Sequence, residues 1–214
     1  MKIVTVDGFA IRQLLDTEFG LLHSHCLVAT EYAPKFYIPS EETWIGKRFL
    51  DELEFLLWVE RELAGKVGKG YQEKRAEMRQ RLGDKKDGGV FTVETGKVDD
   101  CLVRYVRGEG VRRELDPEFV FGGNGFVYDY VPKNEVWIDV KVDPKEIPFV
   151  LLHELTERKL MMSEKKSYDV AHDMAVAVEK EERRTHGAKY PGDADYDIKE
   201  GELWEKIKIS EISR

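Results

Sequence analysis

The chain contains very little cysteine and no long apolar run. Its 214 residues include two cysteines, Cys26 and Cys101, which excludes the disulfide framework of a small secreted domain. No segment approaches the roughly 18 consecutive apolar residues of a membrane-spanning helix. The N-terminal segment also lacks the uninterrupted apolar core of a signal peptide. We therefore expect a cytoplasmic protein that does not enter a membrane.

Amide side chains are scarce as well. Glutamine occurs at positions 13, 72 and 80 and asparagine at 124 and 134, whereas charged residues make up 36% of the chain. This balance is typical of proteins from thermophiles. Because such organisms tolerate intracellular disulfides, a Cys26–Cys101 bond stays open as an alternative to the favoured interpretation, two buried free thiols.

The overall charge is acidic. The formal net charge is −8 and the pI is about 5.3, so we do not expect nucleic acid as a partner, because phosphate binding needs clustered Lys and Arg. Hydrophobic residues make up 42% of the chain, which is enough for a folded core. The length suits one large domain or two small ones.

Local patterns predict a mixture of strands and helices. Strands are expected at residues 2–6, 23–30, 90–94 and 102–106, and helices at 9–15, 41–64, 71–82 and 109–115. Three features predict the long helix 41–64: a capping Ser40, the acidic residues after it, and apolar positions from Trp44 to Leu63. His23 and His25 would share one face of their strand, where we interpret them as half-exposed strand residues and not as metal ligands.

A β-hairpin is expected at residues 126–140. Residues 126–131 and 135–140 alternate as strands do, and Pro132-Lys133-Asn134 between them is turn chemistry. The glycine-rich segment 122–125 lacks the pattern of a phosphate-binding loop and is interpreted as a flexible turn. No internal repeat is evident. We expect an α+β fold in which a small, mostly antiparallel sheet with this hairpin packs against a C-terminal helix pair and the long N-terminal helix.

The polar, glycine-containing segment 84–89 is the best candidate for a boundary inside the chain. It would separate an N-terminal region, residues 1–88, from a domain of residues 89–214 that carries the hairpin and the helix pair. The alternative is one compact unit.

The helix pair, expected at residues 143–162 and 167–186, carries most of the chemically interesting side chains. On the first helix His153 and Glu157 lie one turn apart on one face, beside apolar residues. On the second, Tyr168, His172 and Glu179 share a face. Imidazole and carboxylate groups on apolar helix surfaces are costly unless they are paired or ligated. A bound metal ion would satisfy all of them at once, and an interhelical ion-pair network would be the metal-free alternative.

The first helix of the pair also resembles a known enzyme motif. A hairpin followed by a helix with His-Glu-x-x-Glu is similar to the core of the zincin metallohydrolases, whose helix carries His-Glu-x-x-His. The resemblance implies that His153 is a metal ligand and Glu154 the general base. Glu157 stands where the family has its second histidine, and a carboxylate ligand suits zinc as well as Mn or Fe. His172 would be the third ligand, with Glu179 as a fourth ligand or as a residue that orients another.

A second resemblance covers the same helices. Residues 153–161, His-Glu-Leu-x-Glu-Arg-x-Leu-Met, and residues 168–172, Tyr-x-x-Ala-His, are similar to segments of a group of uncharacterised phage and archaeal proteins. This resemblance implies a shared site without naming a reaction.

These observations lead to two hypotheses. The first is a zincin-like, metal-dependent hydrolase acting on a peptide or protein, with Glu154 and Tyr168 as catalytic residues and the hairpin as the rim of the site. Zinc is the expected ion. The second is a non-enzymatic interaction protein whose helix pair holds a structural ion-pair network.

Overall fold

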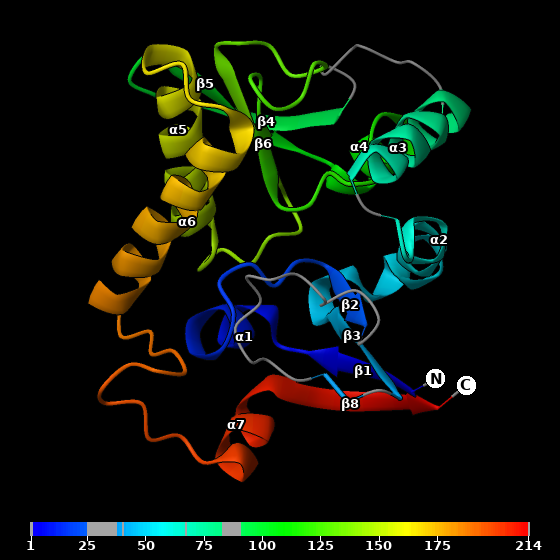
Figure 1. The fold of residues 1–214 in the computed structure, drawn as a ribbon, viewed down its shortest axis with the longest axis vertical. Coiled ribbons are helices and arrows are strands. Elements are labelled where there is room, and N and C mark those ends of the chain that lie inside the picture. Colours follow the sequence, from blue (N-terminus) through cyan, green and yellow to red (C-terminus); the bar gives the residue numbers. More distant parts are fainter. Residues whose placement is uncertain (1, 25–37, 40, 67, 83–90, 214) are drawn as a thin grey trace. The chain divides into compact units, whose positions relative to one another are not determined.

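The computed structural model describes residues 2–24, 38–39, 41–66, 68–82 and 91–213 (Figure 1). It has the predicted α+β fold and divides into two compact units. Unit 1 consists of Met1–Lys66 and Arg183–Arg214, and unit 2 of Val67–Glu182. This division differs from the predicted boundary at residues 88 and 89, because the C-terminal strand returns to pair with the first strand of the chain.

Unit 1 is built around a four-stranded mixed sheet. Its elements are β1 (Lys2–Val6), α1 (Gly8–Leu14), β2 (Leu22–Ser24), β3 (Glu42–Gly46), the 3-10 helix η1 (Lys47–Glu52), α2 (Leu53–Leu63), α7 (Glu200–Ile207) and β8 (Lys208–Ser213). The strand order is β2-β3-β1-β8, with β1 and β3 parallel and the outer pairs antiparallel. Apolar side chains from β1, α1, β3 and α7, including Val4, Ile11, Trp44 and Ile207, form its core.

Unit 2 contains a second four-stranded sheet. Its elements are α3 (Gly68–Leu82), β4 (Thr92–Val98), β5 (Cys101–Val106), α4 (Gly108–Glu114), β6 (Gly122–Asn124), β7 (Glu135–Asp139), α5 (Ile147–Ser163) and α6 (Tyr168–Thr185), the last of which ends in unit 1. The strand order is β4-β5-β7-β6, with β5 and β7 parallel. Helix α5 packs on β6 and β7. Each described sheet combines two antiparallel pairings with one parallel pairing, which agrees with the predicted, mostly antiparallel arrangement.

The two sheets share one topology. Each has a strand, a short helix, a three-residue strand and a second long strand that pairs in parallel with the first: β1-α1-β2-β3 in unit 1 and β5-α4-β6-β7 in unit 2. An antiparallel outer strand completes each sheet, β8 beside β1 and β4 beside β5. The outer strand of unit 1 follows its motif in the sequence, and that of unit 2 precedes it.

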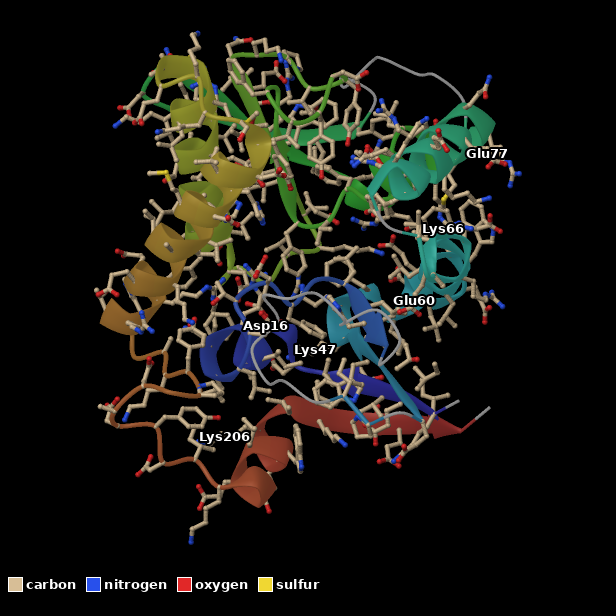
Figure 2. The ribbon with its side chains drawn as sticks, in the orientation of Figure 1. Asp16, Lys47, Glu60, Lys66, Glu77 and Lys206 are labelled. Atoms are coloured by element: carbon tan, nitrogen blue, oxygen red, sulfur yellow. The ribbon has the colours of Figure 1, made fainter. Side chains whose placement is uncertain are left out.

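The same side chains support both copies of this motif. The corresponding pairs are Gly8 and Gly108, Arg12 and Arg112, Asp16 and Asp116, Phe19 and Phe119, Glu42 and Glu135, and Trp44 and Trp137. In each copy the arginine donates a hydrogen bond to the phenylalanine carbonyl oxygen, at a distance of 3.0 Å. Each tryptophan Nε1 donates to the glutamate two residues before it. Asp16, labelled in Figure 2, accepts from the backbone of Glu18 as Asp116 does from Glu118. The chain thus contains an internal repeat, and the expectation of none was wrong.

The predicted helix 41–64 is replaced by a strand and a shorter helix. Residues Glu42–Gly46 form the buried strand β3, and α2 begins only at Leu53. The reason is the parallel pairing of β3 with β1, which buries Thr43, Trp44 and Ile45, residues with high strand propensity. Ser40, the predicted cap, lies outside the described residues.

The prediction of a hairpin at residues 126–140 is wrong for its first strand. Strand β7 pairs with β6, the glycine-rich segment that was expected to be a turn, while residues 126–131 form turns. The Asn124 carbonyl oxygen accepts from the backbone N–H groups of both Val127 and Tyr128, which closes a turn directly after β6. A side chain at Gly123 would overlap the Tyr128 ring, so glycine is what allows this close return.

The other described elements follow the predictions. The strands expected at 2–6, 90–94 and 102–106, the helices at 9–15, 71–82 and 109–115, and the helix pair all recur with shifted ends. Most of the strand expected at 23–30 lies outside the described residues, as do His25 and Cys26. Cys101 is a buried free thiol. Among the described residues, no helix combines the length and apolarity needed to cross a membrane.

His23 makes the stability of unit 1 dependent on pH. Its Nε2 accepts a hydrogen bond from the Gly20 N–H at 2.8 Å, and burial lowers its pKa from 6.5 to about 4, with the charge of Arg12 adding to the effect. Between these values the unfolded chain binds a proton that the folded chain does not. Stability should therefore be lost as the pH falls from about 6.5 towards 4, by on the order of 2 kcal/mol for this residue after allowance for its partial exposure.

His23→Gln tests this prediction, because glutamine keeps an acceptor that does not titrate. Denaturant unfolding across this pH range should show a smaller loss of stability in His23→Gln than in the wild type. The exposed His186 provides a matched control, and His186→Gln should behave as the wild type. Equal acid sensitivity in all three proteins would contradict the assignment.

Candidate metal centre

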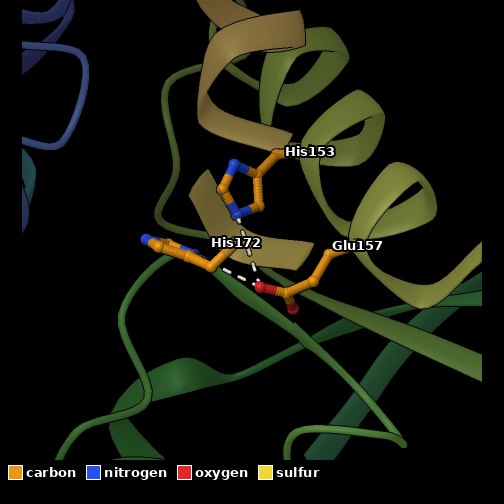
Figure 3. A group of neighbouring side chains, drawn as sticks. All are labelled: His153, Glu157 and His172. Carbon is orange, nitrogen blue, oxygen red and sulfur yellow. Dashed lines mark hydrogen bonds and ion pairs between the residues drawn. The ribbon is translucent and has the colours of Figure 1, made fainter. Parts of the chain in front are cut away.

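Three potential ligands meet between α5 and α6 in unit 2. His153 and Glu157 come from α5 and His172 from α6 (Figure 3). Each offers one donor atom, and the three atoms lie within 4.8 Å of one another. Glu157 Oε1 is 3.2 Å from His172 Nδ1 and 3.9 Å from His153 Nε2. The predicted meeting of the two helices at these side chains is therefore present.

The position of the group also gives it access to solvent. The Glu157 side chain is 3% exposed, whereas that of His172 is 30% exposed, so an ion could arrive past His172. The two imidazole rings stand edge to face, with centroids 5.0 Å apart. Arg158 does not fill the space between them, because its Nε donates to the Lys133 carbonyl oxygen at 3.0 Å.

Glu179 contacts the opposite side of the His153 ring. Its carboxylate lies 3.1 Å from His153 Nδ1, whereas His153 Nε2 is the nitrogen that faces Glu157. A carboxylate accepts hydrogen bonds, so this contact favours the tautomer with the proton on Nδ1 and leaves the Nε2 lone pair directed at the group. Carboxylates commonly orient metal-binding histidines in this way. Glu179, predicted as a ligand or an orienting residue, is placed for the second role.

Asn124 connects the two glutamates of α5. Its Nδ2 donates to Glu157 Oε2 at 2.7 Å and to Glu154 Oε2 at 3.1 Å, and its Oδ1 accepts from the Phe126 N–H. The side chain is fully buried. Asn124 was not among the predicted site residues, because the glycine-rich segment 122–125 has the local pattern of a turn. The sequence did offer one signal for Asn124: asparagine is rare in this chain, and this one follows the pair Gly122-Gly123 ahead of the helix with His153.

Glu154 is a buried carboxyl group whose proton affinity is raised. Burial raises its pKa to about 7, the negative charge of Glu157 acts in the same direction, and His153, His172 and the Asn124 hydrogen bond oppose them. The side chain is buried next to Gly122. A Cβ at Gly122 would lie 3.2 Å from Glu154 Cγ and 3.0 Å from Val150, so the glycine allows α5 to approach the sheet closely.

Tyr168, the predicted catalytic tyrosine, differs in its surroundings from Tyr128 and Tyr130 in the turns after β6. Tyr168 stacks on His172 with a centroid distance of 5.4 Å, and its side chain is 45% exposed. Partial burial and the charges of Glu157 and Glu154 raise its pKa to about 12, so its phenol stays protonated and can donate a hydrogen bond. Tyr128 donates to the Glu118 carbonyl oxygen, and Tyr130 packs in the core of unit 2. Of the three, Tyr168 is the one in ring contact with a potential ligand.

The repeat provides an internal comparison for these residues. The run Glu157-Arg158-x-Leu160 in α5 corresponds to Glu60-Arg61-x-Leu63 in α2. In this alignment the positions of His153 and Glu154 are occupied by Leu56 and Leu57, both buried, and that of His172 by Arg75. The arginine, aspartate and tryptophan that support the sheets occur in both copies, whereas the imidazoles occur in one.

The donor set matches a metal site in chemical type. Two imidazole nitrogens and one carboxylate oxygen form one of the usual ligand sets of catalytic zinc, with a fourth position left for water. Ligands around zinc lie about 3.3 Å apart, given metal–ligand bonds of about 2 Å, so side-chain rotations would have to bring the widest pair closer. Comparisons with protein-family models, with curated protein sequences and with solved structures find no match.

Proposed function

We propose that the chain is a metal-dependent hydrolase in which His153, Glu157 and His172 hold a divalent ion, most favourably zinc. The observation that carries the proposal is the convergence of their three donor atoms within 4.8 Å. Mn and Fe are the alternative ions, because one of the three ligands is a carboxylate. The lack of both imidazoles in the other copy of the repeat supports a functional role for them.

Each side chain around the ion has a role in this proposal. An ion held by His153, Glu157 and His172 would lower the pKa of a coordinated water towards 7. Glu154, held by Asn124, would accept a proton from this water as the water oxygen attacks a substrate carbonyl carbon, and would return it to the leaving amine as the C–N bond breaks. Tyr168 donates to the oxygen that becomes negatively charged. Glu179 keeps His153 in the ligating tautomer.

The proposed substrate is a peptide or protein. The rim that the hairpin was expected to form is supplied by the turns of residues 125–131, which follow directly from Asn124. Strand β6, at one edge of its sheet, ends at the same residue. An extended peptide that lies along this edge would pass beside the candidate metal centre.

Glu154→Gln tests the proposed chemistry most specifically, because glutamine keeps the shape of the side chain but cannot accept the proton. In zinc-loaded, tag-free protein assayed with a library of internally quenched peptides, this variant should lower kcat by about 10²-fold or more while the zinc content stays that of the wild type. The exposed Glu164 gives a matched control, and Glu164→Gln should leave kcat unchanged. Full activity in Glu154→Gln, or hydrolysis that persists in excess chelator, would contradict the mechanism.

A second candidate function is a non-enzymatic interaction protein with a structural ion-pair network. The observation that favours it is that the same groups already pair with one another, His153 with Glu179 and His172 with Glu157. A thermal midpoint that does not respond to Zn²⁺, Mn²⁺ or chelator would favour this network. Under the hydrolase proposal, zinc at 100 times its dissociation constant should stabilise the fold by about 2.7 kcal/mol.

A further inference from the structure

A hollow of about 230 Å³ opens in unit 2 between α3 and the turn that follows β6. Arg75 and Arg79, one helical turn apart, lie on the α3 side together with the Gln72 amide. Tyr128 and Asp129 lie on the side of the turn. Two arginines thus line the same small space.

The arginines are held in place but keep hydrogen-bonding capacity. Arg75 donates from Nη2 to the buried Asp116 at 2.7 Å, and its Nε lies 3.1 Å from Glu118. Arg79 donates from Nη2 to Asp129 at 2.6 Å. In the part of the chain that the structure describes, the Nη1 group of neither arginine has a hydrogen-bond partner. Each guanidinium therefore has free N–H donors, arranged as the planar fork that suits a carboxylate.

One of the existing contacts is easily replaced. The Asp129 side chain is 70% exposed, and an ion pair of this kind contributes less than about 1 kcal/mol. A ligand carboxylate could take the place of Asp129 on Arg79 at little cost. Arg75, in contrast, is fixed by a carboxylate with no exposure, so its position is set before any ligand arrives.

The hollow adjoins the candidate metal centre. The turn that supplies Tyr128 is closed by the carbonyl oxygen of Asn124, whose side chain contacts Glu154 and Glu157. The Arg75 guanidinium lies over the ring of Tyr128, 5.8 Å from its centroid. The two sites are therefore neighbours within one unit.

We propose that this hollow binds a carboxylate of the substrate, so that the preferred substrate is a peptide with an acidic residue close to the cleaved bond. The claim that a peptide bond is cleaved near the acidic residue rests on the proposed hydrolase function. The claim that Arg75 and Arg79 bind a carboxylate does not depend on that function. The proposal can therefore be tested in two independent parts.

The first part measures binding in the absence of metal. Isothermal titration of succinate into chelator-treated protein should give a dissociation constant in the millimolar range or tighter. Arg79→Gln should weaken binding about tenfold. Arg81 lies on the same helix outside the hollow and pairs with the exposed Glu77, labelled in Figure 2, so Arg81→Gln removes the same charge and should change nothing. Equal effects of the two variants, no succinate binding, or tighter binding of inorganic phosphate than of succinate would overturn the proposal.

The second part measures hydrolysis by zinc-loaded protein. Two quenched peptides are compared that carry either Glu or Gln beside the cleaved bond. The Glu peptide should have a kcat/KM about tenfold higher than the Gln peptide. Arg79→Gln should remove this difference by lowering kcat/KM for the Glu peptide only. Succinate binding that depends on Arg79 without hydrolysis of any peptide would refute the hydrolase function and leave the carboxylate site standing. Hydrolysis of both peptides at equal rates, with no succinate binding, would refute the carboxylate site alone.

Discussion

Replacing Arg112 by methionine is expected to lower the free energy of unfolding by about 3–5 kcal/mol. Arg112 and Asp139 form an ion pair at 2.8 Å in which both side chains have no solvent exposure. Arg112 also donates to the carbonyl oxygens of Phe119 and Val120. Methionine would fill much of the volume but leave the Asp139 carboxylate buried without its main counter-charge. Guanidinium unfolding followed by circular dichroism measures the loss.

The internal repeat supplies a matched control for this change. Arg12 occupies the same position in unit 1 and makes the same bond to Phe19, but the position of Asp139 is occupied by Gly46. Arg12→Met leaves no equivalent of Asp139 buried without its counter-charge, so its loss of stability should be smaller than that of Arg112→Met. Adding Asp139→Asn to Arg112→Met should recover part of the stability. Equal losses in the two single variants would show that the buried carboxylate is not the source of the effect.

Removing either imidazole of the candidate metal centre is expected to weaken zinc binding by at least about 100-fold, because one of three protein ligands is lost. His153→Ala and His172→Ala should behave alike in competition with a chromophoric chelator. His186 lies outside the group and is exposed, so His186→Ala should bind as the wild type does. A similar affinity in all four proteins would show that zinc binds elsewhere.

Replacing Glu179 should reduce the zinc affinity less than replacing either histidine. Because Glu179 contacts His153 Nδ1 and not Nε2, the proposed ligand nitrogen, Glu179→Gln is expected to weaken zinc binding by about tenfold. The exposed Glu181 on the same helix offers the control Glu181→Gln, with no expected change. A loss in Glu179→Gln as large as in His153→Ala would instead make Glu179 a direct ligand.

The helix pair could be predicted because its signal is local. His153 and Glu157 stand one turn apart beside apolar neighbours, and a short polar connector separates the two helices, so the pattern alone brings the group together. The role of Asn124 could not be predicted in this way. Its contacts with Glu154 and Glu157 depend on the packing of α5 against β6, which no local pattern specifies.

The missed strand β3 has a similar physical explanation. Its N-terminal side carries the serine and acidic residues typical of a helix start, and local propensity therefore favoured a helix. The outcome is decided by parallel pairing with β1, whose residues are distant in the sequence. Thr43, Trp44 and Ile45 carried a weaker strand signal that this pairing reinforces.

The repeat escaped the sequence analysis because its identical residues are widely spaced. Gly8, Arg12 and Phe19 recur as Gly108, Arg112 and Phe119, but most positions between them differ. The outer strands β4 and β8 lie on opposite sides of their motifs in the sequence, which hides the correspondence further. An arginine buried in the same contact in both copies was the most specific signal available.

The metal content of tag-free protein tests the central proposal most directly. Wild-type protein loaded with excess zinc and then desalted should retain about one ion per chain, given a site with three protein ligands. The double variant His153→Ala/His172→Ala, folded as judged by circular dichroism, should retain almost none. No retained zinc in the wild type, or equal retention in the double variant, would contradict a metal centre between α5 and α6.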